Sequence, residues 1–108
     1  MEYAKLGKSG IEVSRLCVGC MSFGRPSEDF HEWTLNPNET EEIVKKALDL
    51  GINFFDTANT YSHGTSEEYL GRALKKNIAR NKVVIGTKVY LTKDIFPKRL
   101  SDGKLTAP

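Results

Sequence analysis

Short apolar runs alternate with amphipathic segments along this chain of 108 residues, in the manner of a mixed α/β protein. The apolar runs predict short strands, and the segments with apolar residues three and four apart predict helices. The expected strands are 2–6, 11–13, 15–19, 52–56 and 82–89, and the expected helices begin near Asn38 and near Thr65. The first two strands should form a hairpin, in which Gly10 suits a positive-φ turn position.

Both helices carry sequence signals for their ends and their buried faces. Asn38 and Glu41 have the spacing of a capping box, as do Thr65 and Glu68, and Gly51 is a natural stop for the first helix. Apolar side chains share one face of each helix, which we expect to pack against a sheet. They are Ile43, Val44, Ala47 and Leu48 in the first helix and Tyr69, Leu70, Ala73 and Leu74 in the second.

The order strand, helix, strand, helix, strand predicts parallel strands joined by crossover helices. Such a sheet needs cover that these few elements cannot supply alone, so we expect its edges to be completed by further chain or by a partner. Residues 21–37 are expected to form a long loop. Residues 94–108 show no clear period and are expected to be an irregular tail.

Composition and charge narrow the classes of function. The chain has 16 basic and 14 acidic side chains and a net charge of +2, which is too balanced to favour nucleic acid or an anionic membrane. The basic stretch 75–82 is better explained as a solvated helix end. No signal peptide and no membrane-spanning apolar run is evident, so we expect a cytoplasmic protein.

Each of the three later strands ends in polar or permissive residues. Gly19-Cys20, Asp56 and Lys88 occupy these positions, and Tyr61 lies five residues past Asp56. The carboxyl ends of parallel strands meet at one edge, where ligands bind in both open sheets and barrels. We therefore expect an acid, a phenol and a base to converge there.

This set of side chains has a chemical logic. A phenol is a poor proton donor near neutral pH, but a nearby lysine cation favours its phenolate form. A carboxylate beside the lysine holds the cation in place. Such a tyrosine can protonate a carbonyl oxygen while a hydride reaches the carbon, and the hydride must come from a cofactor.

A family resemblance covers about residues 3 to 90. The segments that carry it are Gly51-Ile52-Asn53-Phe54-Phe55-Asp56-Thr57-Ala58, Tyr61, Ser66-Glu67-Glu68, Leu70-Gly71 and Leu74, with Leu6-Gly7, Ser9-Gly10, Val13-Ser14, Gly19-Cys20-Met21-Ser22-Phe23-Gly24 and Gly86-Thr87-Lys88 around them. Together they closely resemble the aldo-keto reductase family. A signature of this length is far more specific than a single glycine motif.

The resemblance implies an α/β fold, the N-terminal part of a (β/α)8 TIM barrel whose N-terminal β-hairpin plugs the bottom. It implies NADPH as hydride donor and a small aldehyde or ketone as substrate. Tyr61 would be the acid–base residue, Lys88 would tune it, and Asp56 would pair with Lys88 and border the cofactor. Further expected positions are Gly19, Cys20 and Met21 on the nicotinamide-ribose side and Phe23 and Trp33 on the substrate pocket wall.

Two parts of the family pattern are missing from these residues. The family orients the carbonyl with a histidine at the end of the fourth strand, whereas His31 and His63 fall in loops. It also grips the adenosine phosphates from the last barrel strands. Because such a barrel needs about 250 residues, residues 1–108 are expected to be one segment of a single barrel domain, with an incomplete barrel, and inactive in isolation.

Two other functions compete with the enzyme. A non-catalytic barrel fragment would act by assembly, with self-association through its open strand edges. A dithiol or metal module would use the C-x-x-C pair Cys17 and Cys20. Against that module, Cys17 lies in an expected buried strand and zinc ligands at standard spacing are missing, so no metal is expected.

Overall fold

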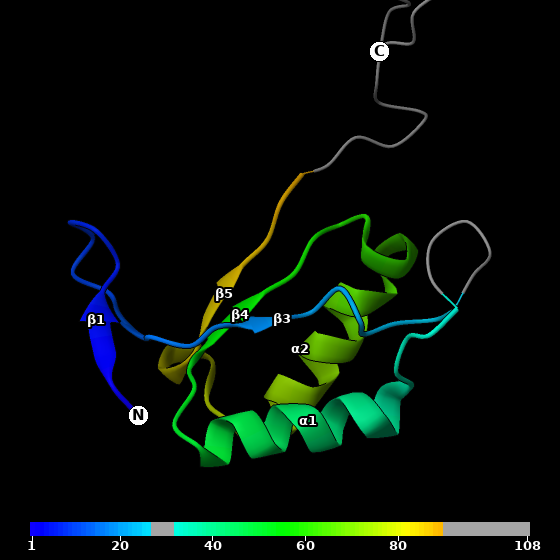
Figure 1. Cartoon of the computed structure of the whole chain (residues 1–108), viewed down its shortest axis with the longest axis horizontal. Helices are drawn as coiled ribbons and strands as arrows, with labels where there is room; N and C mark the ends of the chain where they lie inside the picture. Colours follow the sequence, from blue (N-terminus) through cyan, green and yellow to red (C-terminus); the bar gives the residue numbers. More distant parts are fainter. Residues whose placement is uncertain (27–31, 90–108) are drawn as a thin grey trace, which may run out of the picture.

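The fold centres on a small parallel sheet, seen in a computed structural model that describes residues 1–26 and 32–89. Strands β3 (Val18–Gly19), β4 (Phe54–Asp56) and β5 (Val84–Gly86) pair in that order and in parallel (Figure 1). Helix α1 (Pro37–Asp49) joins β3 to β4, and helix α2 (Thr65–Asn77) joins β4 to β5. This confirms the predicted parallel α/β arrangement. The expected tail 94–108 lies outside the described residues.

The strands are shorter than the apolar runs that predicted them. The run 15–19 yields only β3, and the residues before it are not covered: Leu16 is 60% exposed and Cys17 is exposed as well. The run 82–89 yields only β5, with a short 3-10 turn η2 (Arg80–Lys82) before it. Lys88 therefore lies two residues beyond the strand in which it was expected. An apolar run shows that a segment is apolar, not that it is paired and covered along its whole length.

An antiparallel hairpin, β1 (Tyr3–Lys5) and β2 (Glu12–Ser14), lies at the amino ends of the parallel strands. The Tyr3 hydroxyl donates to the Gly51 carbonyl at 2.6 Å, just before β4. Asn53 is bonded to the hairpin at Ser14, whose amide donates to Asn53 Oδ1 at 2.7 Å. The hairpin is confirmed, and it occupies the end of the sheet opposite to the expected site.

Helix α1 begins earlier than its predicted cap. Asn36, not Asn38, is the N-cap: its side chain accepts from the Glu39 amide at 2.8 Å, and Glu39 Oε1 accepts from the Asn36 amide at 3.1 Å. Pro37 explains the shift, because its fixed φ suits the first helical position and its missing N–H needs no partner there. The predicted box of Asn38 and Glu41 is wrong by two residues.

Helix α2 begins without a side-chain cap. Its N-cap is Gly64 at φ +92, and the predicted box of Thr65 and Glu68 does not form. The Thr65 hydroxyl is committed elsewhere: it donates to the Ser62 carbonyl at 2.6 Å and accepts from the Arg25 amide at 2.8 Å. The residue that looked like a cap therefore ties two loops together.

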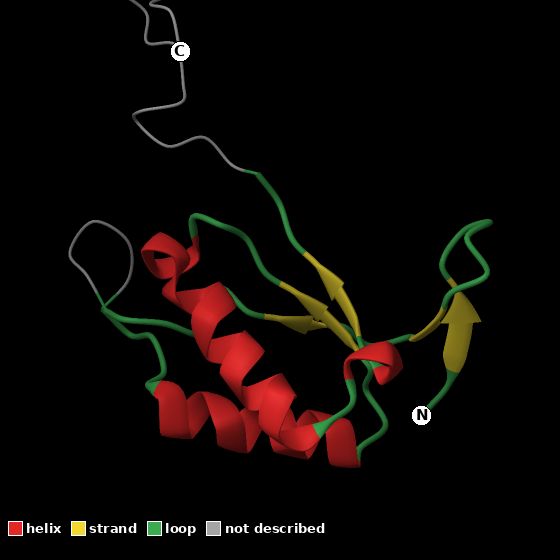
Figure 2. Cartoon of the chain, turned by 180° about the vertical axis from the view of Figure 1, so that it is seen from behind, coloured by secondary structure: helices red, strands yellow, loops and turns green. Residues whose placement is uncertain are grey.

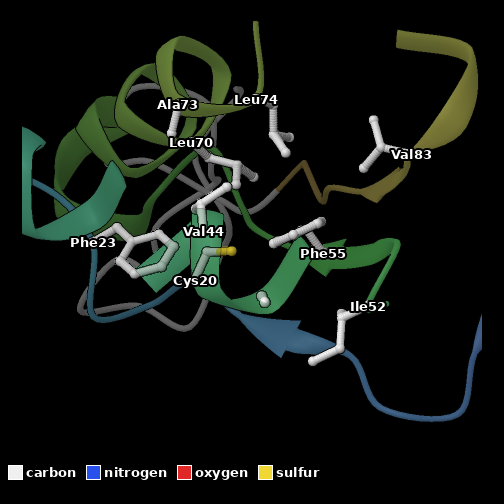
Figure 3. Close-up of a cluster of buried hydrophobic side chains, with 10 residues drawn as sticks. Cys20, Phe23, Val44, Ile52, Phe55, Leu70, Ala73, Leu74 and Val83 are labelled. Atoms are coloured by element: carbon white, nitrogen blue, oxygen red, sulfur yellow. The ribbon is translucent and has the colours of Figure 1, made fainter. Parts of the chain in front are cut away.

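The core lies between the helices and the sheet. Both helices cover the same face of the sheet and pack against each other (Figure 2). Apolar side chains from both helices, strand β4, the loop after β3 and the residues just before β4 and β5 meet there (Figure 3). They are Cys20, Phe23, Val44, Ala47, Ile52, Phe55, Leu70, Ala73, Leu74 and Val83. Five of the predicted helical core positions are among them, whereas Ile43 is 45% exposed.

Candidate active site

The three side chains expected to converge do meet at the carboxyl end of the sheet. Lys88 Nζ donates to Asp56 Oδ1 at 2.9 Å, to the Thr57 carbonyl at 2.9 Å and to Tyr61 Oη at 3.2 Å. The same nitrogen lies 4.9 Å from the centroid of the Tyr61 ring. An ammonium group has three protons, so these contacts engage all of its donors. Lys88 thus joins the carboxylate to the phenol.

The backbone beyond the strands brings these residues together. Asp56 is the last residue of β4, and the ladder continues from there, because the Thr57 amide donates to the Gly86 carbonyl at 2.8 Å. The Asn59 amide then donates to the Lys88 carbonyl at 3.3 Å. The loop after β4 therefore runs beside the segment after β5, and Lys88 lies next to the residues that precede Tyr61.

Tyr61 opens a tight turn whose shape is unusual. It is the first residue of the 3-10 segment η1 (Tyr61–Gly64), and the next two residues, Ser62 and His63, have φ of 49° and 54°. Left-handed geometry is uncommon outside glycine, costs energy and persists only where the surrounding structure enforces it. Gly24 packs directly against Ser62 and Thr65, where any Cβ would come within 2.4 Å of Ser62 Cβ. This contact braces the turn that carries the phenol.

The electrostatics favour a charged lysine. The hydrogen bond to Asp56 raises the pKa of Lys88 above its ordinary value, and the hydrogen bond to Tyr61 raises it further, whereas partial removal from water lowers it. The Lys88 and Asp56 side chains are 45% and 44% exposed, so water screens the pair. The expectation that Lys88 lies inside the strand 82–89 is wrong, because β5 ends at Gly86. Lys88 is accommodated by its three hydrogen bonds and by its partly exposed location at the carboxyl end of the sheet.

Two glycines flank Asp56 in the sheet. Gly19 of β3 and Gly86 of β5 pair with it in register on either side. A Cβ at Gly19 would meet nothing within 4 Å, and one at Gly86 would lie 3.6 Å from Asp56 Oδ1. The carboxylate is thus bordered by backbone without side chains, and neighbouring Met21 is 42% exposed. The edge of the sheet at Gly19 therefore has an open strip of space beside Asp56.

Cys20 contributes its backbone to this edge and its side chain to the core. Its amide donates to the Asp56 carbonyl at 2.8 Å, and its thiol is 0% exposed. Burial raises the pKa of that thiol to about 12. A dithiol centre needs an accessible thiol of low pKa, so the structure speaks against the C-x-x-C module. Cys17 and Cys20 are both free cysteines.

The expected pocket-wall residues take different positions. Phe23 is 1% exposed, so its ring fills the core and does not line an open pocket. It bridges to Leu35 through the backbone, which closes the loop after β3 against the segment before α1. Trp33 is 58% exposed. His63 lies in η1, and His31 falls outside the described residues.

Sequence reasoning missed the Thr57 carbonyl, the remaining acceptor of Lys88. Every residue has such a carbonyl, so no sequence signal could have found it.

Within the described residues, no group of three or more metal-ligating side chains comes together. No helix there is both long and apolar enough to cross a bilayer.

Comparisons with known proteins identify the family of this chain. The sequence model of the Aldo/keto reductase family matches residues 15–105. Versiconal hemiacetal acetate reductase from Aspergillus parasiticus is 48% identical over 108 residues, which cover 96% of this chain and 31% of that protein. The aldo-keto reductase dtxS3 from Metarhizium robertsii is 45% identical, over 95% of this chain and 27% of its own length.

A solved structure extends the likeness to the fold. The holo form of an aldo-keto reductase from Bacillus halodurans superposes with a TM-score of 0.67 at 34% identity, over 96% of this chain and 28% of that one. The chain therefore spans about 30% of the length of the proteins that it matches. The neighbouring structures are (β/α)8 barrels, of which the described residues form an α/β part without barrel closure.

Proposed function

Because this chain belongs to the aldo/keto reductase family, we propose that it supplies the proton-donating part of an active site that reduces an aldehyde or ketone to an alcohol. NADPH would provide the hydride. The choice of NADPH over NADH rests on the family resemblance. The observation that carries the proposal is the contact of Lys88 Nζ with both Asp56 Oδ1, at 2.9 Å, and Tyr61 Oη, at 3.2 Å.

Those contacts suit the loss of a proton from Tyr61. Lys88 donates to the phenol oxygen, so the phenol's own proton is directed away from the ammonium group. When that proton passes to a substrate oxygen, the adjacent cation stabilises the phenolate that is left. Asp56 keeps the cation in place and charged, because it is the main cause of the raised Lys88 pKa. In this proposal Tyr61 is the acid, Lys88 stabilises its phenolate, and Asp56 holds Lys88 in place.

The strip beside Asp56 fits the nicotinamide-ribose part of the cofactor. Gly19 leaves open space there, and Met21 is accessible next to it. We propose that Gly19, Met21 and the Asp56 carboxylate hold this part of NADPH, and that Cys20 acts through its backbone position. Trp33, which is exposed on the loop before α1, is proposed to border the substrate.

The proton-donor role predicts the effect of removing one oxygen. In the native protein with NADPH and a reactive aldehyde, Tyr61→Phe should lower kcat by about 100-fold or more, in the usual range of general acid catalysis. Tyr69→Phe is the matched control, because Tyr69 lies on α2 and outside the contacts of Lys88. Equal activity in the two variants would refute the assignment of Tyr61.

The cofactor role has a separate test. Gly19→Val fills the open space beside Asp56 without a positive-φ penalty, so it should weaken NADPH binding measured by fluorescence or calorimetry. Gly71→Val, whose added side chain also has open space but lies on α2 and not beside Asp56, should not. Unchanged affinity in Gly19→Val would exclude this strip as the cofactor site.

A second candidate is a non-catalytic barrel segment that acts through assembly. Among the described residues β5 pairs on one side only, and an apolar groove of about 490 Å³ runs between its edge and α2. Gly71, Leu74, Lys75, Ile78, Arg80, Val83 and Ile85 line it. The intact mass of the native protein separates the candidates: a mass near 12.1 kDa with tight self-association and no carbonyl reduction supports assembly. A larger, active protein supports the enzyme.

A further inference from the structure

A pair of buried hydroxyls lies directly beneath the candidate site. Thr57 and Ser66 are 2% and 0% exposed, and their hydroxyl oxygens are 2.9 Å apart. Ser66 Oγ is also 2.6 Å from the Cys20 carbonyl. The pair therefore connects the end of β4, the first turn of α2 and the loop after β3, three segments that are distant in sequence.

The chemistry of the pair fixes the direction of its hydrogen bonds. The Cys20 carbonyl can only accept, so Ser66 donates to it. A serine hydroxyl has a single proton, so Ser66 must accept from Thr57. Both hydroxyls are satisfied only in this order, from Thr57 through Ser66 to Cys20. We call these two residues the hydroxyl relay.

Thr57 is held by its backbone as well as by the relay. Its amide donates to the Gly86 carbonyl at 2.8 Å, and its carbonyl accepts from Lys88 Nζ at 2.9 Å. The Thr57 carbonyl is thus one of three acceptors that decide where the ammonium group lies. A shift of Thr57 would move Lys88 relative to Asp56 and Tyr61, because the ammonium group contacts all of them.

We propose that Thr57 and Ser66 are positioning residues, whose hydroxyl relay holds the Thr57 carbonyl where it sets the contact between the Lys88 ammonium and the Tyr61 phenol. The relay acts through Lys88 and needs no contact with substrate. Its catalytic consequence rests on the proposed function, whereas its effect on Lys88 does not.

The experiment follows the Lys88 ammonium by NMR titration, together with carbonyl reduction, in the native protein. Thr57→Val removes the hydroxyl and keeps the shape. It should bring the pKa of Lys88 back toward its ordinary value, since Asp56 and Tyr61 are the titratable groups whose contacts raise it. It should also lower kcat about tenfold or more with little change in KM, because misplaced groups slow the chemical step. Thr57→Ser restores the hydroxyl and should recover both.

Thr40→Val is the matched control. Thr40 is also 0% exposed, but its hydroxyl has no hydrogen-bond partner in the part of the chain that the structure describes, and it lies on α1. A Thr57→Val protein with the titration and kcat of Thr40→Val would overturn the proposal. If Thr57→Val does not fold, Ser66→Ala tests the relay from its other end with the same two outcomes. If the native protein reduces no carbonyl, the proposed function fails, and the Lys88 titration still decides the positioning role.

Discussion

Gly24 offers a sharp test of how the Tyr61 turn is held in place. Its φ of +128° is a conformation that side chains rarely adopt, and an added Cβ would lie 2.4 Å from Ser62 Cβ and 2.6 Å from Thr65 Oγ1. Gly24→Ala therefore imposes two costs, one in the backbone and one in packing. Because Ser62 follows Tyr61 directly, a shift of Ser62 away from the added methyl would also move the turn that carries the phenol.

The two costs can be estimated separately. A residue held in a sparsely populated φ/ψ region costs about 1–3 kcal/mol. Forcing an extra methyl into a packed site costs about 1–3 kcal/mol more. We therefore expect Gly24→Ala to lower the free energy of unfolding by about 2–6 kcal/mol, a large part of the total for a small domain.

Two other glycines separate the contributions in urea unfolding. Gly10 has φ +79° and nothing within 4 Å of its added Cβ, so Gly10→Ala should show the backbone cost alone, about 1–2 kcal/mol. Gly71 lies inside α2 with open space around it, so Gly71→Ala should stabilise by about 0.5–1 kcal/mol. If Gly24→Ala loses no more stability than Gly10→Ala, the close packing of Gly24 on Ser62 is refuted.

Further predictions concern the helix cap, the cysteines and the ion pair. Asn36→Ala should lower the free energy of unfolding in urea by about 1 kcal/mol, because Asn36 caps α1. Asn38→Ala should lower it by less than about 0.5 kcal/mol. The reverse order would show that Asn38 is the cap, as the sequence predicted. Under native conditions iodoacetamide should label exposed Cys17 and spare Cys20, whose burial raises its pKa to about 12; equal labelling by mass spectrometry would contradict this burial. Because the folded-state pKa of Lys88 is raised, its stabilising contribution is complete below 10.5 and is lost as pH rises through the folded value. The Tm difference between wild type and Lys88→Met should thus hold steady from neutral pH to about pH 10 and shrink above about pH 10.5. A loss near neutral pH would argue against the pair.

The sequence predicted the meeting of Asp56, Tyr61 and Lys88 because parallel strands bring their carboxyl ends to one edge. It could not predict how each residue is held there. Lys88 was expected inside a strand, since hydrophobic runs do not reveal which residues stay paired. Asn38 was expected to cap α1, since cap spacing repeats in this polar segment and Pro37 decides between the candidates. Phe23 was expected on a pocket wall, but its aromatic ring packs in the hydrophobic core.

The three acceptors around Lys88 also have a consequence for which cation the site can use. A carboxylate, a peptide carbonyl and a phenol oxygen surround one nitrogen, at 2.9, 2.9 and 3.2 Å. A guanidinium group carries the same charge, but it spreads its donors over a rigid plane and cannot direct them from a single atom. Arginine at this position would keep the electrostatic field and lose the geometry, so the shape of the cation is selected here as strictly as its sign.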